Sequence, residues 1–472
     1  MRRWIVVLAC AATACGSKPT DEPGAKRDAG AAPDAAVLDV PGRTLGMPDL
    51  ASYGWRKRGG HPAFRVARAA EAKEDWAAVV TTCKQALAAD PGHLEASWLL
   101  AAGLGKLGKL DALLPPLQLA AAGDFGKWGL ASLELPSLQA FLATPLGDGW
   151  RRRVEADRAA YVTAVTRSVI VTADGDLFAF DAQAPRWYRL TRTFGVVIGA
   201  LRLGPTKIAY VTRQRSAKDK KTTLAIGLID LSRGKTSRPI ELGTKGPITI
   251  ARGPDAANKS TGVWIGNGSP RSTSWRLFDD DFHLTALPPK SQRPPGAWLE
   301  VKGKRTKLHA LPVAGVIADW DDKGFASAIR VGKQGRVVTV PAPGLIDGNT
   351  AAWSPDRSQL AFAAKLDDTC APGATNAAAF VADATTGMVT ELERAADGLA
   401  IEWVADRKLA IAGDKGVSII DLDGGAPVPL AGADGLLPPR HRPTCTPPDP
   451  DDLPPEDPEA AATAAKLEPA TE

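Results

Sequence analysis

A strand–turn–strand pattern that recurs from Ser168 to Gly432 constrains the fold of this 472-residue chain more than any other feature. Short runs of β-branched, aromatic and other apolar residues end at an Asp, pass through a turn that contains Gly, and then resume. This pattern is typical of β-hairpins, because such side chains fit a pleated sheet and Gly allows the positive φ of tight turns. The clearest copies occupy 169–181, 224–234, 379–387 and 417–425.

A second phrase stands before one of these hairpins. Residues Trp353–Asp356 read Trp-Ser-Pro-Asp and lead into Leu360–Phe362, and weaker copies occur at 402–411 and 201–210. The phrase resembles the Trp-Ser-Pro-Asp-Gly repeat of TolB-like β-propellers, with Arg357 in place of the usual Gly. The resemblance implies that the Trp packs between neighbouring sheets, that Ser-Pro-Asp forms a turn, and that Leu-Ala-Phe is a buried second strand.

The two phrases together indicate about six units of roughly 35–55 residues, close to the length of a four-stranded propeller blade. The units that start near Gly246 and Gly296 are degenerate, so seven blades are the alternative count. An array of immunoglobulin-like sandwiches is the structural rival, but it does not explain the Trp-Ser-Pro-Asp phrase. We therefore predict an all-β propeller over residues 167–433.

Residues 61–166 follow a helical period instead. Apolar side chains return every three or four residues in two series, which Asp90-Pro91-Gly92 separates. Further helices are expected before Glu71 and around Leu135–Leu142 and Trp150–Ala164. The multidomain chain thus begins with a short all-α module, which precedes the propeller.

The segment Asp75–Pro91 resembles the second helix of a tetratricopeptide repeat, and a second unit fits at a period of about 34 residues with Ala101 at the small position. The resemblance implies a helical-repeat module whose concave groove binds peptides. A purely structural helical cap on the next domain is the alternative. Cys83 lies on the apolar face, where we expect a buried thiol.

The N-terminal residues predict that the protein is exported from the cytoplasm. Two Arg after Met1 precede an apolar stretch that is too short for a permanent membrane span, which is the layout of a secretory signal. The stretch ends at Cys15 and resembles the lipobox of bacterial lipoproteins, although Ala12 stands where that family favours Leu. A second candidate, Cys10, would leave an apolar core of only about five residues. A plain secretory signal is the other alternative.

The resemblance implies that residues 1–15 are a signal peptide and that Cys15 is acylated. Residues 16–50 and 438–472 are rich in Pro, Ala and charged residues, so we expect a disordered tether and a disordered tail. Gly16 resembles the second residue of lipoproteins that leave the inner membrane. We therefore expect the periplasmic face of the outer membrane, with surface display as the alternative.

The remaining cysteines predict no metal site. None of the five has the Cys-x-x-Cys spacing of a structural zinc site. Cys370 lies in a Gly/Pro-rich insertion and Cys445 follows the last unit, so an oxidising compartment would allow them to form a disulfide. The sequence does not set the distance between them, and both the paired and the unpaired state stay open.

The chain carries no motif that assigns a reaction. Its five His are isolated, and we expect them to be solvated side chains. The run Asp279–Asp281 lacks the spacing of a calcium loop and indicates a polar turn. The net charge is +5, and the one dense basic run, 213–221, has no aromatic residues for base stacking, so it indicates a solvated loop. A patch for an anionic partner is the alternative reading of that run.

These observations predict a non-catalytic cell-envelope lipoprotein that binds a protein or an envelope component through the propeller and the helical groove. We expect no cofactor, no metal and no nucleic acid, and contact with the membrane only through the lipid. The alternative is a propeller enzyme, a hydrolase or lyase, whose catalytic residues converge from separate blades. The sequence assigns no catalytic residue and favours the binding protein.

Overall fold

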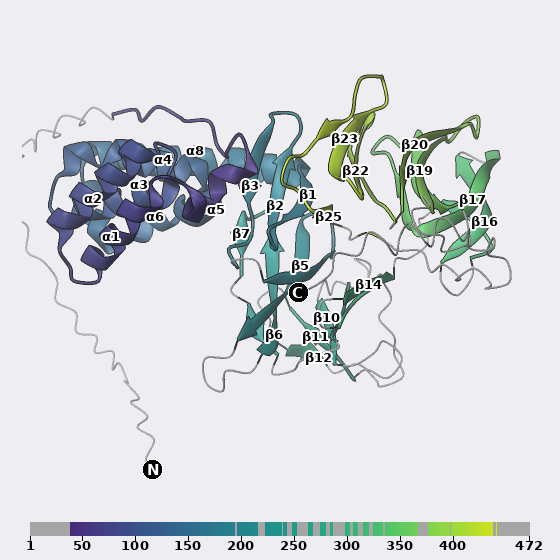
Figure 1. Ribbon diagram of the computed structural model, residues 1–472, viewed down its shortest axis with the longest axis horizontal. Helices are drawn as coiled ribbons and strands as arrows, with labels where there is room; N and C mark the ends of the chain where they lie inside the picture. The colour runs from purple at the N-terminus through teal and green to yellow at the C-terminus, as the bar shows by residue number, and fades with distance from the viewer. Residues whose placement is uncertain are drawn as a thin grey trace, which may run out of the picture.

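The computed structural model of the protein describes residues 38–193, 196–215, 222–237, 239–242, 248–252, 263–267, 274–279, 284–286, 298–302, 305–309, 315–320, 324–333, 336–366, 376–396, 398–437 and 440. A helical region comes first, and antiparallel sheets in a propeller-like arrangement follow it (Figure 1). The predicted order, an all-α module before an all-β propeller, is confirmed.

The helical region consists of consecutive helices that pack one after the next, α1 on α2, α2 on α3 and α3 on α4. Local chemistry sets where they begin. The Asp75 carboxylate accepts a hydrogen bond from the Ala78 amide at the start of α2, and the Thr144 hydroxyl does the same for Gly147 in α8. The α-helices are α1 (His61–Glu71), α2 (Trp76–Ala89), α3 (Leu94–Lys106), α4 (Leu114–Gly123), α5 (Phe125–Trp128), α6 (Ala131–Glu134), α7 (Gln139–Leu142) and α8 (Pro145–Arg167); short 3-10 turns occupy Leu50–Tyr53, Trp55–Lys57, Leu110–Ala112 and Pro136–Leu138.

Small and branched apolar side chains fill the helical core. Cys83 is fully buried as a free thiol, as the apolar face of its helix predicted. Gly103 lets α3 approach α2 closely, because a Cβ there would lie 3.1 Å from side-chain carbons of both Val79 and Val80. None of the helices among the described residues combines the length and apolar composition that a membrane span requires.

The strands form five antiparallel sheets in the part of the chain that the structure describes. The first is ordered β25 (Gly435–Leu436), β1 (Val169–Ala173), β2 (Asp176–Asp181), β3 (Arg186–Arg189); the second β4 (Val197–Arg202), β5 (Lys207–Arg215), β6 (Thr222–Asp230), β7 (Lys235–Thr236), with β8 (Ile240–Glu241) also on β6. The third is ordered β12 (Leu284–Ala286), β11 (Ser274–Phe278), β10 (Val263–Asn267), β9 (Ile248–Arg252), β13 (Trp298–Lys302), β14 (Arg305–His309). The fourth is ordered β15 (Val316–Ile317), β16 (Phe325–Lys333), β17 (Arg336–Trp353), β18 (Gln359–Lys365), β19 (Ala377–Asp383), β20 (Val389–Ala395), and the fifth β21 (Ala400–Ala405), β22 (Lys408–Gly413), β23 (Gly416–Asp421), β24 (Val428–Pro429).

The last strand, β25, joins the first sheet and so links the end of the β region to its beginning. β25 pairs with β1 in the register Val171 to Leu436 and Thr172 to Gly435. The Asp174 amide also donates a hydrogen bond to the Asp434 carboxylate at 2.9 Å. Because the C-terminal strand completes the sheet that begins the β region, the sheets form one body and not a row of independent sandwiches.

The sheets in the described part of the chain do not correspond one to one to the six predicted blades. β17 pairs with β16 from Arg336 to Pro341 and again at Ile346 and Asp347, and it pairs with β18 from Leu345 onward. β13 likewise adds to the edge of β9. Two sheets therefore have six strands each, and they include the stretch in which the sequence phrases are degenerate as well as the clearest phrase.

The Trp-containing phrases connect neighbouring sheets, as the resemblance implied. The Trp403 indole donates to the Ala352 carbonyl at 2.8 Å, and the Asp356 amide donates to the Asp406 carboxylate at 3.0 Å. The Ser354 hydroxyl donates to Asp356 within the turn. Equivalent positions of two successive phrases thus hold the fourth and fifth sheets together.

Residues 38–50 are packed, although the sequence placed them in the disordered tether. Val40 and Leu45 are buried. The Gly46 amide donates to the Ala122 carbonyl, and Met47 exchanges two hydrogen bonds with Trp187 of β3. The segment lies between helices and the first sheet, so its order depends on distant partners that its composition cannot show. The rest of the predicted tether, 16–37, and the tail beyond 440 lie outside the described residues.

Candidate functional site

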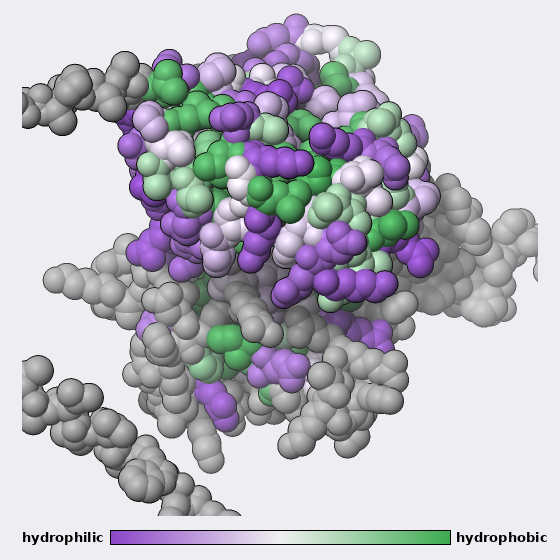
Figure 2. Space-filling view, turned by 90° about the vertical axis from the view of Figure 1, so that its left-hand side faces the viewer, coloured by the Kyte–Doolittle hydropathy of each residue, from purple (hydrophilic) through white to green (hydrophobic). Residues whose placement is uncertain are grey.

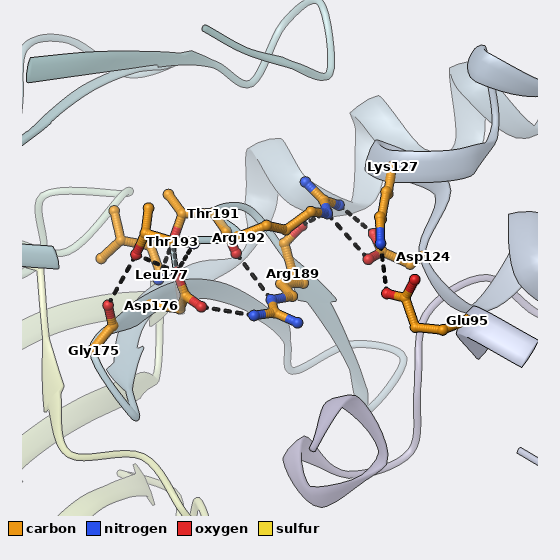
Figure 3. A network of polar contacts seen from close by, with 10 residues as sticks. All are labelled: Glu95, Asp124, Lys127, Gly175, Asp176, Leu177, Arg189, Thr191, Arg192 and Thr193. Atoms are coloured by element: carbon orange, nitrogen blue, oxygen red, sulfur yellow. Dashed lines mark hydrogen bonds and ion pairs between the residues drawn. The ribbon is translucent and has the colours of Figure 1, made fainter. Parts of the chain in front are cut away.

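The helical region and the first sheet meet in a buried polar joint (Figure 3). Asp124 lies between α4 and α5, and Arg192 follows β3. The Arg192 guanidinium donates twice to the Asp124 carboxylate, and both side chains are largely buried. The Tyr53 hydroxyl, also buried here, donates to the carbonyls of Gly123 and Trp187. Burial raises the pKa of Tyr53 well above its usual value.

Asp176 fixes the loop that carries Arg192. Its carboxylate, only 3% exposed, accepts hydrogen bonds from the Arg189 guanidinium at 2.7 Å and from the hydroxyls of Thr191 and Thr193. The Thr191 hydroxyl in turn accepts from the Leu177 amide at 2.8 Å. A buried carboxylate with several donors is well satisfied, so this loop has one defined conformation.

A tryptophan pair covers the joint on the helical side. Trp98 of α3 and Trp128 of α5 stack with ring centroids 4.2 Å apart, and both rings are only partly buried. The Lys127 ammonium lies 3.9 Å from the centroid of Trp128 and forms an ion pair with Glu95. Figure 2, which views the helical end of the molecule, shows hydrophobic patches set among hydrophilic side chains.

A small pocket of about 80 Å³ opens next to this joint. Its walls come from α5 and α8 and from the turn that joins β6 to β7. Three of its side chains are cationic, and none is acidic. The lining residues are Phe125, Gly126, Lys127, Leu130, Ala131, Arg158, Tyr161, Arg233 and Gly234.

A second, partly buried ion pair links two sheets that are far apart in the sequence. The Arg202 guanidinium, at the end of β4, donates to Glu402 Oε1 of β21 at 2.7 Å. Glu402 Oε2 is buried and has no hydrogen-bond partner among the described residues. Burial raises the pKa of this carboxyl group to about 7, although Arg202 opposes the shift.

The three cysteines that the sequence singled out lie outside the described residues: Cys15, the predicted lipidation site, and Cys370 and Cys445, the possible disulfide pair. Of the run Asp279–Asp281, only Asp279 is described. No group of three or more His, Cys, Asp and Glu side chains that could hold a metal occurs in the described part of the chain.

The expectation that every His is a solvated surface side chain is wrong for His93. This side chain is fully buried, and its Nδ1 accepts a hydrogen bond from the Ala96 amide at the start of α3. It packs against Phe64 at 4.8 Å and Trp55 at 5.7 Å between ring centroids. Burial lowers its pKa. The His acts as a helix cap inside an aromatic cluster, a role that the adjacent Pro91-Gly92 turn concealed.

Sequence reasoning also missed the joint and the pocket. Arg192 and Asp124 are 68 positions apart, and Arg202 and Glu402 are 200 apart. Asp124 and Arg192 belong to no repeated phrase, and although Arg202 and Glu402 lie in two weak copies, nothing in the phrase pairs them. The one local sign was the cluster of charged and aromatic residues at 124–128.

The likenesses to known proteins come from solved structures. No protein-family model and no curated protein matches the chain. Among solved structures, TolB from Acinetobacter baumannii matches with 14% identity and a TM-score of 0.28, over 57% of this chain and 64% of that one. AztD from Citrobacter koseri matches with 10% identity and a TM-score of 0.28, over 56% and 95%. The tricorn protease matches with 11% identity and a TM-score of 0.30, over 57% and 26%. The match thus spans less than two thirds of the TolB chain, and no family is assigned from these likenesses.

Proposed function

We propose that the protein is a non-catalytic binding or scaffold lipoprotein of the cell envelope, which holds a partner protein against its helical region. The observation that carries the proposal is the partly exposed stack of Trp98 on Trp128, flanked by Lys127. Tryptophan is enriched among the residues that dominate the binding energy of protein interfaces. A large ring that stays partly exposed on a packed helical surface is therefore the expected anchor for a partner.

The helices provide a scaffold for such an anchor. α3 begins 33 residues after α1, close to the period of about 34 of tetratricopeptide repeats, and the pairs α1–α2 and α3–α4 pack in sequence. In the proposed arrangement α1 and α3, the first helices of the two pairs, line a groove. The Asp124–Arg192 ion pair joins the end of the fourth helix to the first sheet, which supports a fixed position for the helices.

The experiment is affinity capture from envelope extracts with the mature chain as bait, compared across variants. We expect Trp98→Ala to lose the captured partner and Trp98→Phe to retain most of it, because Phe keeps an aromatic face. The control is Met388→Ala on the second half of the propeller, where the side chain is 72% exposed. Circular dichroism checks that each variant is folded. Capture that survives Trp98→Ala in a folded protein and is lost in Met388→Ala would contradict the proposal.

The envelope address is part of the same proposal and is tested separately. We infer that Cys15 carries the lipid and that the folded body lies at the periplasmic face of the outer membrane. Metabolic labelling with a palmitate analogue is expected to mark the full-length protein. Cys15→Ser should abolish the label and release the protein into the soluble periplasmic fraction, whereas Cys10→Ser should change neither. A label that persists in Cys15→Ser removes this assignment.

A further inference from the structure

The small pocket at the joint has a one-sided charge. Lys127 of α5, Arg158 of α8 and Arg233 of the β6–β7 turn line it, and no Asp or Glu is among its walls. Two of these cations have only loose acidic neighbours: Arg158 is 3.9 Å from Glu155, and Arg233 is 3.6 Å from Asp230. Such exposed pairs contribute little, so their guanidinium groups are available to another anion.

The floor of the pocket is polar and is kept open by glycine. A Cβ at Gly126 would lie 2.7 Å from the Tyr161 hydroxyl and 3.1 Å from Arg192 Nη2. On the other side, Gly234 has a φ of +61°, and a Cβ there would lie 3.0 Å from the Tyr161 ring. Tyr161 is 4% exposed, and burial raises the pKa of its hydroxyl, so the group stays protonated. A protonated tyrosine hydroxyl in the pocket wall can donate a hydrogen bond to a ligand.

The size of the pocket limits the ligand. Sites for drug-sized molecules enclose about 300–1,000 Å³, whereas a single ordered water needs roughly 10–15 Å³ of the space that a water-sized sphere can reach. At about 80 Å³, this pocket fits a group of a few heavy atoms. Arginine binds tetrahedral oxyanions through paired N–H donors, and lysine binds them as a point charge.

We propose that this pocket binds a phosphate-type oxyanion, with Arg158 and Arg233 as the paired donors, Lys127 as a further cation and the Tyr161 hydroxyl as a neutral donor. The walls come from both the helical region and the second sheet, so the bound anion also ties the two together. Binding of this kind stabilises the folded state, because the unfolded chain has no such site. The source of the group is either free phosphate or the phosphate of a monoester.

The test is calorimetric titration of the folded full-length chain with inorganic phosphate, at constant ionic strength set with chloride, together with the thermal midpoint. We expect saturable binding and a rise in the midpoint with phosphate. The double variant Arg158→Gln/Arg233→Gln should bind at least about tenfold more weakly, since both guanidinium groups that donate to the anion are lost. Arg152→Gln, an exposed position on the same helix, is the matched control and should bind within about twofold of the wild type.

A steric variant separates the pocket from general surface charge. Gly126→Ala leaves the charges in place but fills the space next to the Tyr161 hydroxyl, and we expect it also to weaken phosphate binding. A parallel titration with glycerol phosphate distinguishes the two sources: tighter binding of the ester favours a phosphomonoester, and tighter binding of phosphate favours the free ion. Unsaturable binding, or a double variant that binds as the wild type does, overturns the proposal. Neither result bears on the tryptophan-dependent capture of a partner protein.

Discussion

At the scale of single residues, two positions carry strain or charge that the fold has to accommodate. Arg357 takes the place of the Gly that the repeat phrase favours, and its φ of +57° lies in the left-handed region. Glu402 has one buried oxygen with a partner and one without. Arg357 and Glu402 each lie in a copy of the Trp-containing phrase, and each position allows a testable prediction.

Arg357→Gly is expected to stabilise the protein. The left-handed conformation costs an L-residue roughly 1–2 kcal/mol, and the greater freedom of Gly in the unfolded chain removes about half of that gain, so we expect about 0.5–1 kcal/mol. Denaturant titrations of the wild type and the variant measure this gain as a difference in unfolding free energy. Arg357→Ala keeps the strain and should show no comparable gain; equal stabilisation by both variants would place the effect in the Arg side chain.

Glu402→Gln is expected to flatten the dependence of stability on pH. The folded pKa, about 7, is above the ordinary value of 4.5, so the folded state binds the proton more tightly. Stability is therefore fully present below pH 4.5 and falls as pH rises towards 7, by on the order of 1–3 kcal/mol. Unfolding free energies of wild type and variant between pH 4.5 and 8 measure the difference. Parallel curves would show that Glu402 does not titrate in this range.

At the scale of elements, the short strand β25 decides whether the β region is one body. Leu436 is 2% exposed and packs with side chains of the first and fifth sheets, and β25 also lies against β21 and β22. Two residue pairs join β25 to β1, and the amides of Asp434 and Leu437 donate to the carbonyls of Thr172 and Ile170 on either side of them. The closure therefore combines a short strand ladder with side-chain burial.

Leu436→Ala is expected to cost about 2–4 kcal/mol of unfolding free energy, because a leucine this deeply buried leaves a cavity. Hydrogen exchange should accelerate first at the amides of β1, before those of β5. Val428→Ala, on an exposed position of β24, is the control and should change stability by less than about 0.5 kcal/mol. Unchanged exchange at β1 would mean that β25 does not hold the first sheet.

At the scale of the whole molecule, the helical region and the β region share one hydrophobic core. A single cluster of buried residues includes Val165 of α8, Leu177 of β2 and Ile208 of β5. The Asp124–Arg192 pair crosses the same boundary. We therefore expect the two regions to unfold together.

Asp124→Asn is expected to cost about 3 kcal/mol, because removing one partner of a buried ion pair leaves the other charge uncompensated. It should also separate the loss of helix, followed by far-ultraviolet circular dichroism, from the loss of tertiary structure, followed by tryptophan fluorescence. Arg68→Gln, at an exposed pair with Glu71, is the control and should have almost no effect. Two transitions in the wild type would already contradict a shared core.

Local sequence patterns were sufficient to predict the helical region, the β region and the boundary between them at Ser168. Periodicity, helix caps and the Trp-Ser-Pro-Asp turn are local, so neighbouring residues contain the information. The position of Cys83 on a buried face could be predicted for the same reason. Where the phrases are degenerate, the sequence did not predict where one blade ends and the next begins. No local signal there ends a long strand such as β17.

The joint, the pocket and the burial of His93, Val40 and Leu45 could not be predicted from local patterns. Their partners come from segments that are distant in the sequence, and a side chain becomes buried or loses its counterion only when those segments meet. Arg158 and Arg233 look like ordinary surface cations in the sequence. They share a pocket because the helical region docks on the second sheet, and that docking is set by packing at long range and not by any repeated phrase.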